Sequence, residues 1–348
     1  MEVLMQHILW PLLKIVILLG VVSFFVAYGV WLERRLLGFF QARVGPNRVG
    51  PAGLLQPIAD GVKLFLKEDT VPANARPILF RLAPVFAVAP AFLGFAIITW
   101  ARPWVTGEGN HPFVISNINL GILFVLAISS LSVFGIILGG WSSGSKYPLL
   151  GSLRSTSQML SYEIPLTLSV LSVILFAGSF KLSDIVAAQQ RDGVYFLIPG
   201  ILAFGVYLIA SVAETNRLPF DLPEAEGELT AGFHTEYSGM RFAFYMLGEY
   251  TNIILISVIG ASLFLGGYDI PFVNDQALYA VHPHLTSILG LIAFGVKAFL
   301  FFYFFVWIRA TFPRYRYDQL LRIGWKVLLP IALFNLFLAA VLRMWILR

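Results

Sequence analysis

The chain has 348 residues, of which 58% are hydrophobic and only 12% are charged, and its mean hydropathy is +0.80. A composition this apolar indicates an integral membrane protein. The absence of cysteine excludes disulfides, thiol nucleophiles and cysteine-bound iron–sulfur clusters in this chain. No glycine-rich nucleotide-binding loop is present either, so we expect the chain to carry no redox cofactor of its own.

Eight stretches are long and apolar enough to cross a bilayer as helices, which takes about 20 residues each. They cover about residues 8–32, 79–100, 119–140, 157–178, 195–213, 243–265, 286–307 and 326–346. The sequence therefore predicts an all-α membrane protein with eight transmembrane helices in a single domain, residues 1–348. We expect the first stretch to remain as a span, because it has no basic start and no small-residue cleavage site.

Lysine and arginine are distributed unevenly among the loops. Fifteen follow the first, third, fifth and seventh spans: Arg34, Arg35, Arg43, Arg48, Lys63, Lys67, Arg76, Lys146, Arg154, Arg217, Arg241, Arg309, Arg314, Arg316 and Arg322. Three follow the second, fourth and sixth spans: Arg102, Lys181 and Arg191. Because basic loops stay on the cytoplasmic face, both termini are expected on the outer side. The same asymmetry explains the net charge of +5, so no nucleic-acid partner is expected.

An amphipathic helix is predicted within the first loop, at about residues 54–67. Its apolar side comprises Leu54, Leu55, Ile58, Val62, Phe65 and Leu66, and its polar side comprises Gln56, Asp60, Lys63 and Lys67. The segment is too short to span, so it is expected to lie along the membrane surface. It is either a simple anchor or the lining of a polar cavity that is entered from the lipid.

Ionisable residues lie within the apolar stretches, where they are costly and usually mark a proton, ion or substrate path. Glu163, Glu214 and Glu249 are expected at similar depths near the cytoplasmic face, with Glu163 about 9 Å into its span. These three carboxylates suggest a proton relay. Lys297 lies near the middle of its span, and a structural salt bridge to one of the glutamates is the alternative interpretation.

An acidic loop is predicted at about residues 214–242. Its carboxylates are Glu214, Asp221, Glu224, Glu226, Glu228 and Glu236. Close carboxylates repel, which raises some of their pKa values towards neutrality. A solvated acidic run is the usual alternative. However, Pro219, Phe220 and Pro223 stand among the acids, and they favour an ordered, functional segment.

The five histidines are scattered in loops and at one end of the chain: His7, His111, His234, His282 and His284. His282 and His284 are too close in sequence to form the usual metal-binding pair on a helix. No metal site is expected.

Several long motifs resemble those of a known family. Residues 53–68 read GLLQPIADGVKLFLKE, and residues 213–226 read AETNRLPFDLPEAE. Further matching stretches are residues 33–50, 160–165, 236–240 and 312–320. These motifs are similar to those of the core membrane subunit, of the H type, that lies at the quinone chamber of proton-pumping NADH–quinone oxidoreductase, respiratory complex I. The likeness covers nearly the whole chain.

The resemblance implies a subunit that bridges the peripheral and membrane arms of that enzyme. NADH, FMN and iron–sulfur clusters would belong to partner subunits of the peripheral arm, and quinone would be the substrate shared with them. The implied quinone-chamber residues are Glu33, Arg34, Arg35, Gln56, Asp60, Lys63, Phe220 and Asp221. Together with the buried charges, the implied proton-path and coupling residues are Glu163, Glu214, Arg217, Glu224, Glu226, Glu228, Glu249 and Lys297.

One stretch departs from the family pattern. In the span at 119–140 the polar residues of the core are only Ser129, Ser130 and Ser132, where some relatives carry a carboxylate. Whether a proton path includes this helix is therefore left open.

Two other functions compete with the quinone enzyme. The first is the membrane anchor of a related membrane-bound hydrogenase, which the arginine-rich first loop disfavours. The second is an autonomous ion transporter, but no inverted repeat between the halves is evident. The expected location is a bacterial plasma membrane, with lipids as further contacts, and a mitochondrial inner membrane stays open.

Overall fold

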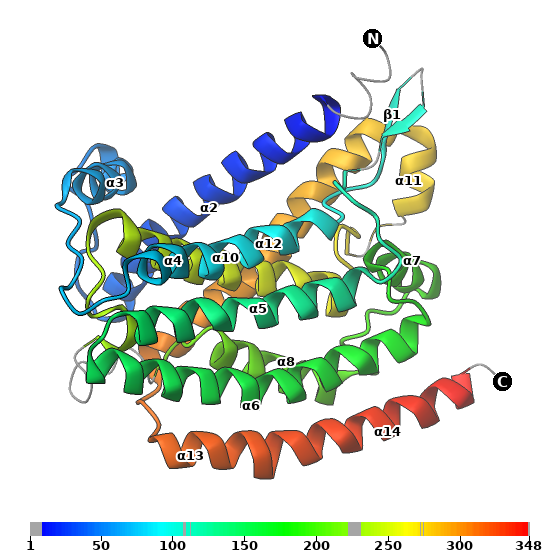
Figure 1. Ribbon diagram of the computed structural model, residues 1–348. Helices are drawn as coiled ribbons and strands as arrows, with labels where there is room; N and C mark the ends of the chain where they lie inside the picture. The colour runs from blue at the N-terminus through cyan, green and yellow to red at the C-terminus, as the bar shows by residue number, and fades with distance from the viewer. Residues whose placement is uncertain are drawn as a thin grey trace.

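The computed structural model describes residues 9–106, 109–111, 113–221, 231–271, 273 and 275–346. Long helices lie side by side along one direction (Figure 1). The short helix α3 (Gln56–Leu66) is at one end of this bundle and a small hairpin is at the other. The N-terminal end of α2 lies near the hairpin, and the C-terminal end of α14 points towards the same end of the bundle but lies on its far side from the hairpin.

Among the described residues, seven segments are long and apolar enough to cross a membrane. They are α2 (Trp10–Phe40), α4 (Pro77–Gly94) with the 3₁₀ turn η3 (Phe95–Ile97), α5 (Gly121–Ser142), α6 (Lys146–Ala177), α10 (Gly239–Phe264), α12 (Pro283–Thr311), and a C-terminal segment of α13 (Tyr317–Arg322), a π-helical turn (Ile323–Leu328) and α14 (Leu329–Ile346). The prediction of a helical, polytopic membrane protein is confirmed at this level.

The remaining predicted span, the fifth at residues 195–213, corresponds to a shorter helix, α8 (Ile201–Glu214). Its 14 residues extend about 21 Å, against about 30 Å for the hydrocarbon core of a bilayer. The prediction started this element at residue 195, but residues 196–200 form turns, and the helix follows Gly200. α8 packs against α6, α10 and α14, so it is an interior helix of the bundle.

Two helices extend further than their apolar stretches. α2 continues to Phe40, eight residues past the predicted limit, because Gly45 and Pro46 are the first strong helix breakers after it. Glu33, Arg34 and Arg35 therefore lie on this helix and not in a loop. α6 begins at Lys146, with Pro148 tolerated in its first turn.

The loop between α4 and α5 contains two strands that the all-α prediction missed. β1 (Trp104–Thr106) pairs antiparallel with β2 (Gly109–His111), and Trp104 lies opposite His111. Three-residue strands are too short for an alternating pattern to reveal them. Two short helices lie at the same end: α7 (Leu182–Asp192) and α11 (Asp275–Val281).

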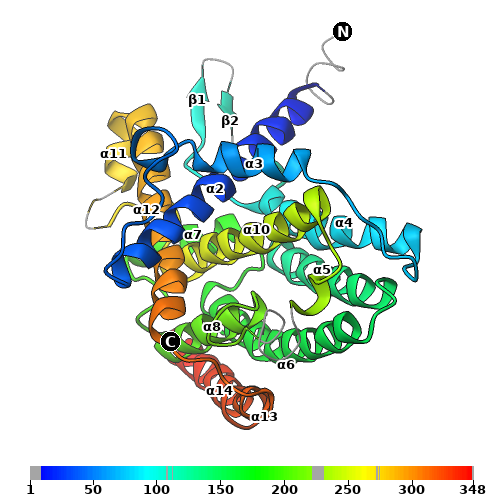
Figure 2. The same ribbon diagram turned by 90° about the vertical axis from the view of Figure 1, so that its left-hand side faces the viewer.

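α10 is the central helix of the bundle. It packs against α2, α3, α4, α6, α7, α8 and α12, and Figure 2 shows it surrounded by the other elements when the molecule is viewed from the α3 end.

Glycines allow two local features of the other helices. A Cβ at Gly135 of α5 would lie 2.5 Å from the backbone nitrogen of Ala87 on α4, so the absence of a side chain lets these two helices approach closely. α6 ends at Gly178, whose φ of 74° is the left-handed conformation that glycine adopts without strain.

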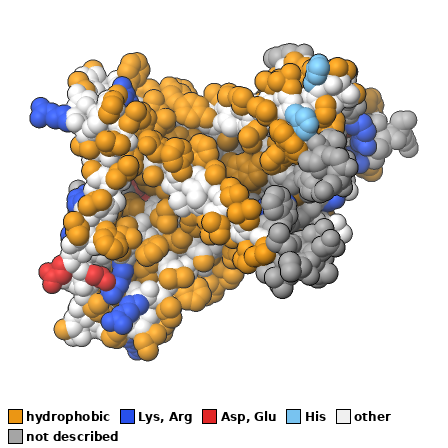
Figure 3. Space-filling view, turned by 90° about the horizontal axis from the view of Figure 1, so that it is seen from above, with side chains coloured by type: hydrophobic (Ala, Val, Ile, Leu, Met, Phe, Trp, Pro, Cys, Tyr) orange, Lys and Arg blue, Asp and Glu red, His pale blue; other side chains and the backbone are white. Residues whose placement is uncertain are grey.

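The surface seen in Figure 3 is mostly hydrophobic between two ends that carry charged or histidine side chains. This distribution is typical of a protein that faces lipid. α3 lies against α2 and α10 but leaves Ile58, Phe65 and Leu66 exposed, as an amphipathic helix at a membrane surface would.

Candidate functional site

Arg217 joins two carboxylates that come from different helices. Its Nη1 donates to Glu33 Oε1 on α2 at 3.0 Å, and its Nε lies 2.7 Å from Glu249 Oε1 on α10. The guanidinium also lies over the ring of Tyr250, 4.5 Å from its centroid. The side chains of Arg217 and Glu33 are 7% and 4% exposed, so this ion pair is shielded from solvent.

Glu33 has a second arginine partner, Arg309, which comes from the end of α12 and donates to the same carboxylate oxygen. Two arginines and two carboxylates thus form one charge-balanced network. Balance matters because a buried ion without a partner is strongly destabilising. The network ties α2, α10 and α12 to the loop after α8.

A second polar group lies between α2 and α3. Arg34 Nη1 donates to Asp60 Oδ2 at 2.7 Å, and Gln56 Nε2 donates to Asp60 Oδ1 at 3.1 Å. Lys63 lies 3.8 Å from the same carboxylate. Arg35 donates to the backbone oxygen of Ala52 at 2.9 Å, which fixes the loop before α3. We refer to Arg34, Gln56, Asp60 and Lys63 as the α2–α3 polar cluster.

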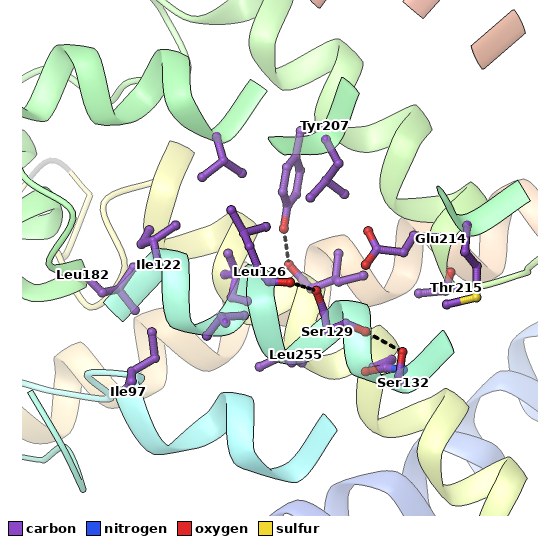
Figure 4. Close-up of a pocket in the computed structure, with 17 residues that line it drawn as sticks. Ile97, Ile122, Leu126, Ser129, Ser132, Leu182, Tyr207, Glu214, Thr215 and Leu255 are labelled. Carbon is purple, nitrogen blue, oxygen red and sulfur yellow. Dashed lines mark hydrogen bonds between the residues drawn. The ribbon is translucent and has the colours of Figure 1, made fainter. Parts of the chain in front are cut away.

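Glu214, the last residue of α8, borders a largely apolar cavity with about 40 Å³ of space for water-sized spheres (Figure 4). Ser129 and Ser132 of α5 line it near Glu214, and Leu182 and Ile97 line it further away. Ser130 donates to Glu163 on α6, and the charges of Glu163 and Glu214 interact. The serines of α5 are therefore part of the polar surroundings of these acids.

A second cavity, with about 60 Å³ of space for water-sized spheres, adjoins the first. The two share five lining residues: Ser132, Met159, Glu214, Thr215 and Asn252. Glu249 and His234 line only the second cavity. Because Glu249 also contacts Arg217, the charge network borders this cavity, and Glu214 lies where the two cavities meet.

The remaining predicted chamber residues, Phe220 and Asp221, lie beside α6 and the α12–α13 loop. Phe220 is 5% exposed, with its ring centroid 5.5 Å from those of Tyr162 and Tyr315. These ring contacts place Phe220 in an aromatic core contact, and its role in lining the chamber stays a prediction. Asp221 accepts from Arg314 Nη2 at 3.1 Å.

Lys297 lies apart from the three glutamates. Its Nζ donates to the backbone oxygens of Leu265, Gly267 and Asp269 at 2.5, 3.0 and 2.6 Å, and it lies 5.1 Å from the centroid of the Tyr195 ring. These carbonyls follow the C-terminal end of α10, where a helix attracts positive charge. In the structure Lys297 therefore binds three backbone carbonyls, where the alternative interpretation expected a salt bridge to one of the glutamates. Glu224, Glu226 and Glu228 lie outside the described residues.

Some residues of the site were not singled out by the sequence. From the sequence, Arg309 and Arg314 were used only to orient the chain in the membrane. His234 was treated as one of five scattered histidines without a role. Asn252 and Tyr250 carried no signal. Asn252 could have been found from its spacing, since it lies three residues after Glu249, and residues three apart on a helix share one face.

Comparisons with known proteins agree on one family. A family model described as NADH dehydrogenase matches residues 13–340. The chain is 49% identical over 337 residues to the H subunit of NADH-quinone oxidoreductase from Thermomicrobium roseum, with 94% of each chain covered. It is 48% identical to an H subunit from Geobacter metallireducens, covering 93% of this chain and 94% of that one. The H subunit from Rhodospirillum rubrum is also 48% identical, with 92% and 91% covered.

Proposed function

Because the chain belongs to the family of H subunits of NADH-quinone oxidoreductase, multi-pass membrane proteins of respiratory complex I, we propose that it links a quinone-binding chamber to proton translocation. Other complex I subunits are its partners. The observation that carries the proposal is the double contact of Arg217, which joins Glu33 near the α2–α3 polar cluster to Glu249 beside the buried cavities.

The α2–α3 polar cluster is the proposed membrane side of the quinone chamber. Arg34 and Lys63 remain 48% and 66% exposed, so their donors are accessible to the carbonyl oxygens of a quinone headgroup. The exposed apolar side of α3 suits the hydrocarbon tail. We propose that Glu33, Arg34, Arg35, Gln56, Asp60, Lys63, Phe220 and Asp221 serve this chamber, which subunits of the peripheral arm complete.

The buried carboxylates are the proposed proton path. Glu214 lines both of the adjoining cavities, Glu249 lines the second, and Glu163 interacts with Glu214. The path then includes the α5 serines, since Ser130 donates to Glu163 and Ser132 lines both cavities. Lys297 is proposed to hold the outer end of α10 in place near this path.

A change of charge at the quinone reaches these acids through Arg217. When the headgroup takes up electrons and protons, the balance of charge around the α2–α3 polar cluster and Glu33 changes. Arg217 cannot release its proton under physiological conditions, so it responds by shifting its contact between Glu33 and Glu249. That shift alters the proton affinity of the acids beside the cavities.

In the proposed arrangement α8 is an eighth span, short but extended by the turns before it, and both termini are on the outer side. The location proposed is a bacterial plasma membrane. The hydrogenase alternative is disfavoured, because the relatives compared carry the name of the quinone enzyme.

The chamber is tested by Asp60→Asn in the whole complex. Asp60 orients Arg34 and Gln56, so its neutralisation should raise the KM for quinone while leaving NADH oxidation by artificial acceptors unchanged. Asp184→Asn is the matched control, because Asp184 also pairs with a lysine three positions away on a short helix, at the opposite end of the bundle. An unchanged KM in Asp60→Asn, or an equal rise in both variants, would remove the chamber from the proposal.

A further inference from the structure

His234 occupies a position in the second cavity that the proposed function does not use. It ends the 3₁₀ turn η4 (Gly232–His234) and is 7% exposed. Its ring lines the cavity with Glu214, Glu249 and Asn252. The chain therefore brings a further proton-binding side chain to the same space as two of the buried carboxylates.

Three buried polar atoms around this cavity have no hydrogen-bond partner among the described residues. They are His234 Nδ1, Glu214 Oε2 and Asn216 Oδ1. Buried polar groups in proteins are nearly always bonded, either to protein or to ordered water. A water needs two to four polar neighbours and room for about one probe sphere of 10–15 Å³, and this cavity has about 60 Å³ of space for water-sized spheres. The cavity therefore has room for a few waters, and its lining includes both His234 and Glu214.

The ring of His234 is held firmly in this position. The ring of Phe233 meets it edge-on at 4.9 Å, and that of Phe242 lies 5.5 Å away. η4 is pressed onto α6, since a Cβ at Gly151 would lie 2.7 Å from the Cα of Gly232. This packing restricts the orientation of the His234 ring, and therefore the positions of its two nitrogens.

The charged and titratable groups around His234 are few. Glu214 faces the cavity from α8, and Glu249 and Tyr245 face it from α10. Asp221, on the preceding loop, interacts with it electrostatically. α5 contains no charged residue, and Met159 is the α6 residue described in the lining. Burial lowers the pKa of His234 to about 4, partly offset by Asp221, so the ring is neutral and one nitrogen is an acceptor.

We propose that His234 is a proton-carrying residue, which exchanges protons with Glu214 through a small water cluster in this cavity. The inference rests on the proposed proton path and adds a residue to it. A proton from the loop side near Asp221 is taken up at one ring nitrogen while the other nitrogen releases one to water that contacts Glu214. The ring is neutral before and after, so no charge accumulates.

The test uses the whole complex in sealed vesicles. His234→Gln keeps a hydrogen-bonding side chain of similar length but cannot carry a proton. We expect it to retain NADH oxidation by artificial acceptors and to lose proton pumping and quinone reduction by roughly 10-fold or more, as loss of a proton-transfer group does. The matched control is His284→Gln, since His284 lies at the opposite end against Trp104. Normal pumping in His234→Gln overturns the proposal.

Chemical rescue separates proton transfer from space filling. His234→Ala opens room for a small azole. Imidazole should restore pumping, and pyrazole, which has the same size but is far less basic, should not. Rescue by both compounds or by neither overturns the proposal. The proposed path itself is tested by Glu214→Gln and Glu249→Gln: if these stop pumping while His234→Gln does not, only the role of His234 fails.

Discussion

The Nη1 of Arg217 donates to Glu33 Oε1 at 3.0 Å, although 184 positions of sequence separate the two residues. The contact joins the helix that carries Arg34 to the loop that follows Glu214. It is a direct structural connection between the two groups of residues that the sequence assigned separately to a chamber and to a proton path.

Replacing Arg217 tests this connection. Arg217→Gln leaves Glu33 and Glu249 without the guanidinium between them, and removal of one partner of a buried ion pair costs about 3–5 kcal/mol. We expect a clear loss of assembled complex. Arg217→Lys keeps the charge but not the planar fork, so it should assemble and reduce quinone slowly. Arg191→Gln is the control, because Arg191 is 73% exposed. A stable, fully active Arg217→Gln complex would contradict this account.

Glu214 and Glu249 are tested separately by neutral variants. Each is expected to leave assembly largely intact as Gln, since at position 249 the amide oxygen can still accept from Arg217, which keeps its pair with Glu33. Quinone reduction and proton pumping should fall together, because a relay needs groups that bind protons. Glu68→Gln, at an exposed position before α4, serves as the control. Proton-to-electron ratios in vesicles are the measurement. If both variants pump normally, these acids have a structural role only.

The acidic loop is expected to couple the quinone site to the acids. Neutralising Glu224 and Glu226 together should depress NADH–quinone activity while sparing NADH oxidation by artificial acceptors, since those acceptors draw electrons from partner subunits. Close carboxylates titrate together and so respond to charge changes nearby. The two activities are compared in membranes with normal complex content. Equal loss of both would show an assembly defect and end the coupling hypothesis.

The burial of His234 predicts a pH dependence of stability. Its pKa is about 4 in the folded chain, against 6.5 for an exposed histidine, so between these values the unfolded chain binds more protons. The contribution of the buried neutral ring to the free energy of unfolding is therefore complete above pH 6.5. It decreases as the pH falls towards 4, by up to about 3 kcal/mol. Melting temperatures of the detergent-solubilised complex should fall more steeply over this window in the wild type than in His234→Gln. Parallel curves would show that the histidine is not buried as a neutral ring.

The orientation is tested with single cysteines, which this chain lacks in its natural sequence. Ser238→Cys precedes α10 on the face with the basic loops, and Arg191→Cys lies on α7 at the other end. A membrane-impermeant reagent added from outside should label Arg191→Cys only. Labelling of Ser238→Cys from the outer face would reverse the topology.

Local patterns in the sequence determined the membrane architecture. Hydropathy predicted the apolar segments because the length of a span depends only on the chain and the thickness of the bilayer. The polar side of α3 was also predicted from the sequence, because the periodicity that places Gln56, Asp60 and Lys63 on one side depends on a single helix. The positions of Glu163, Glu214 and Glu249 within apolar surroundings were evident for the same reason.

The partners of the buried charges were decided only by the tertiary structure. Nothing local indicates that Arg309 contacts Glu33, 276 positions away, or that Lys297 binds the carbonyls beyond α10 and not a glutamate. The start of α8 after Gly200, and its packing against α6, α10 and α14, were also decided by the tertiary structure. His234 entered the cavity beside Glu214 because η4 packs on α6. Such contacts depend on how helices pack, and packing is a property of the whole chain.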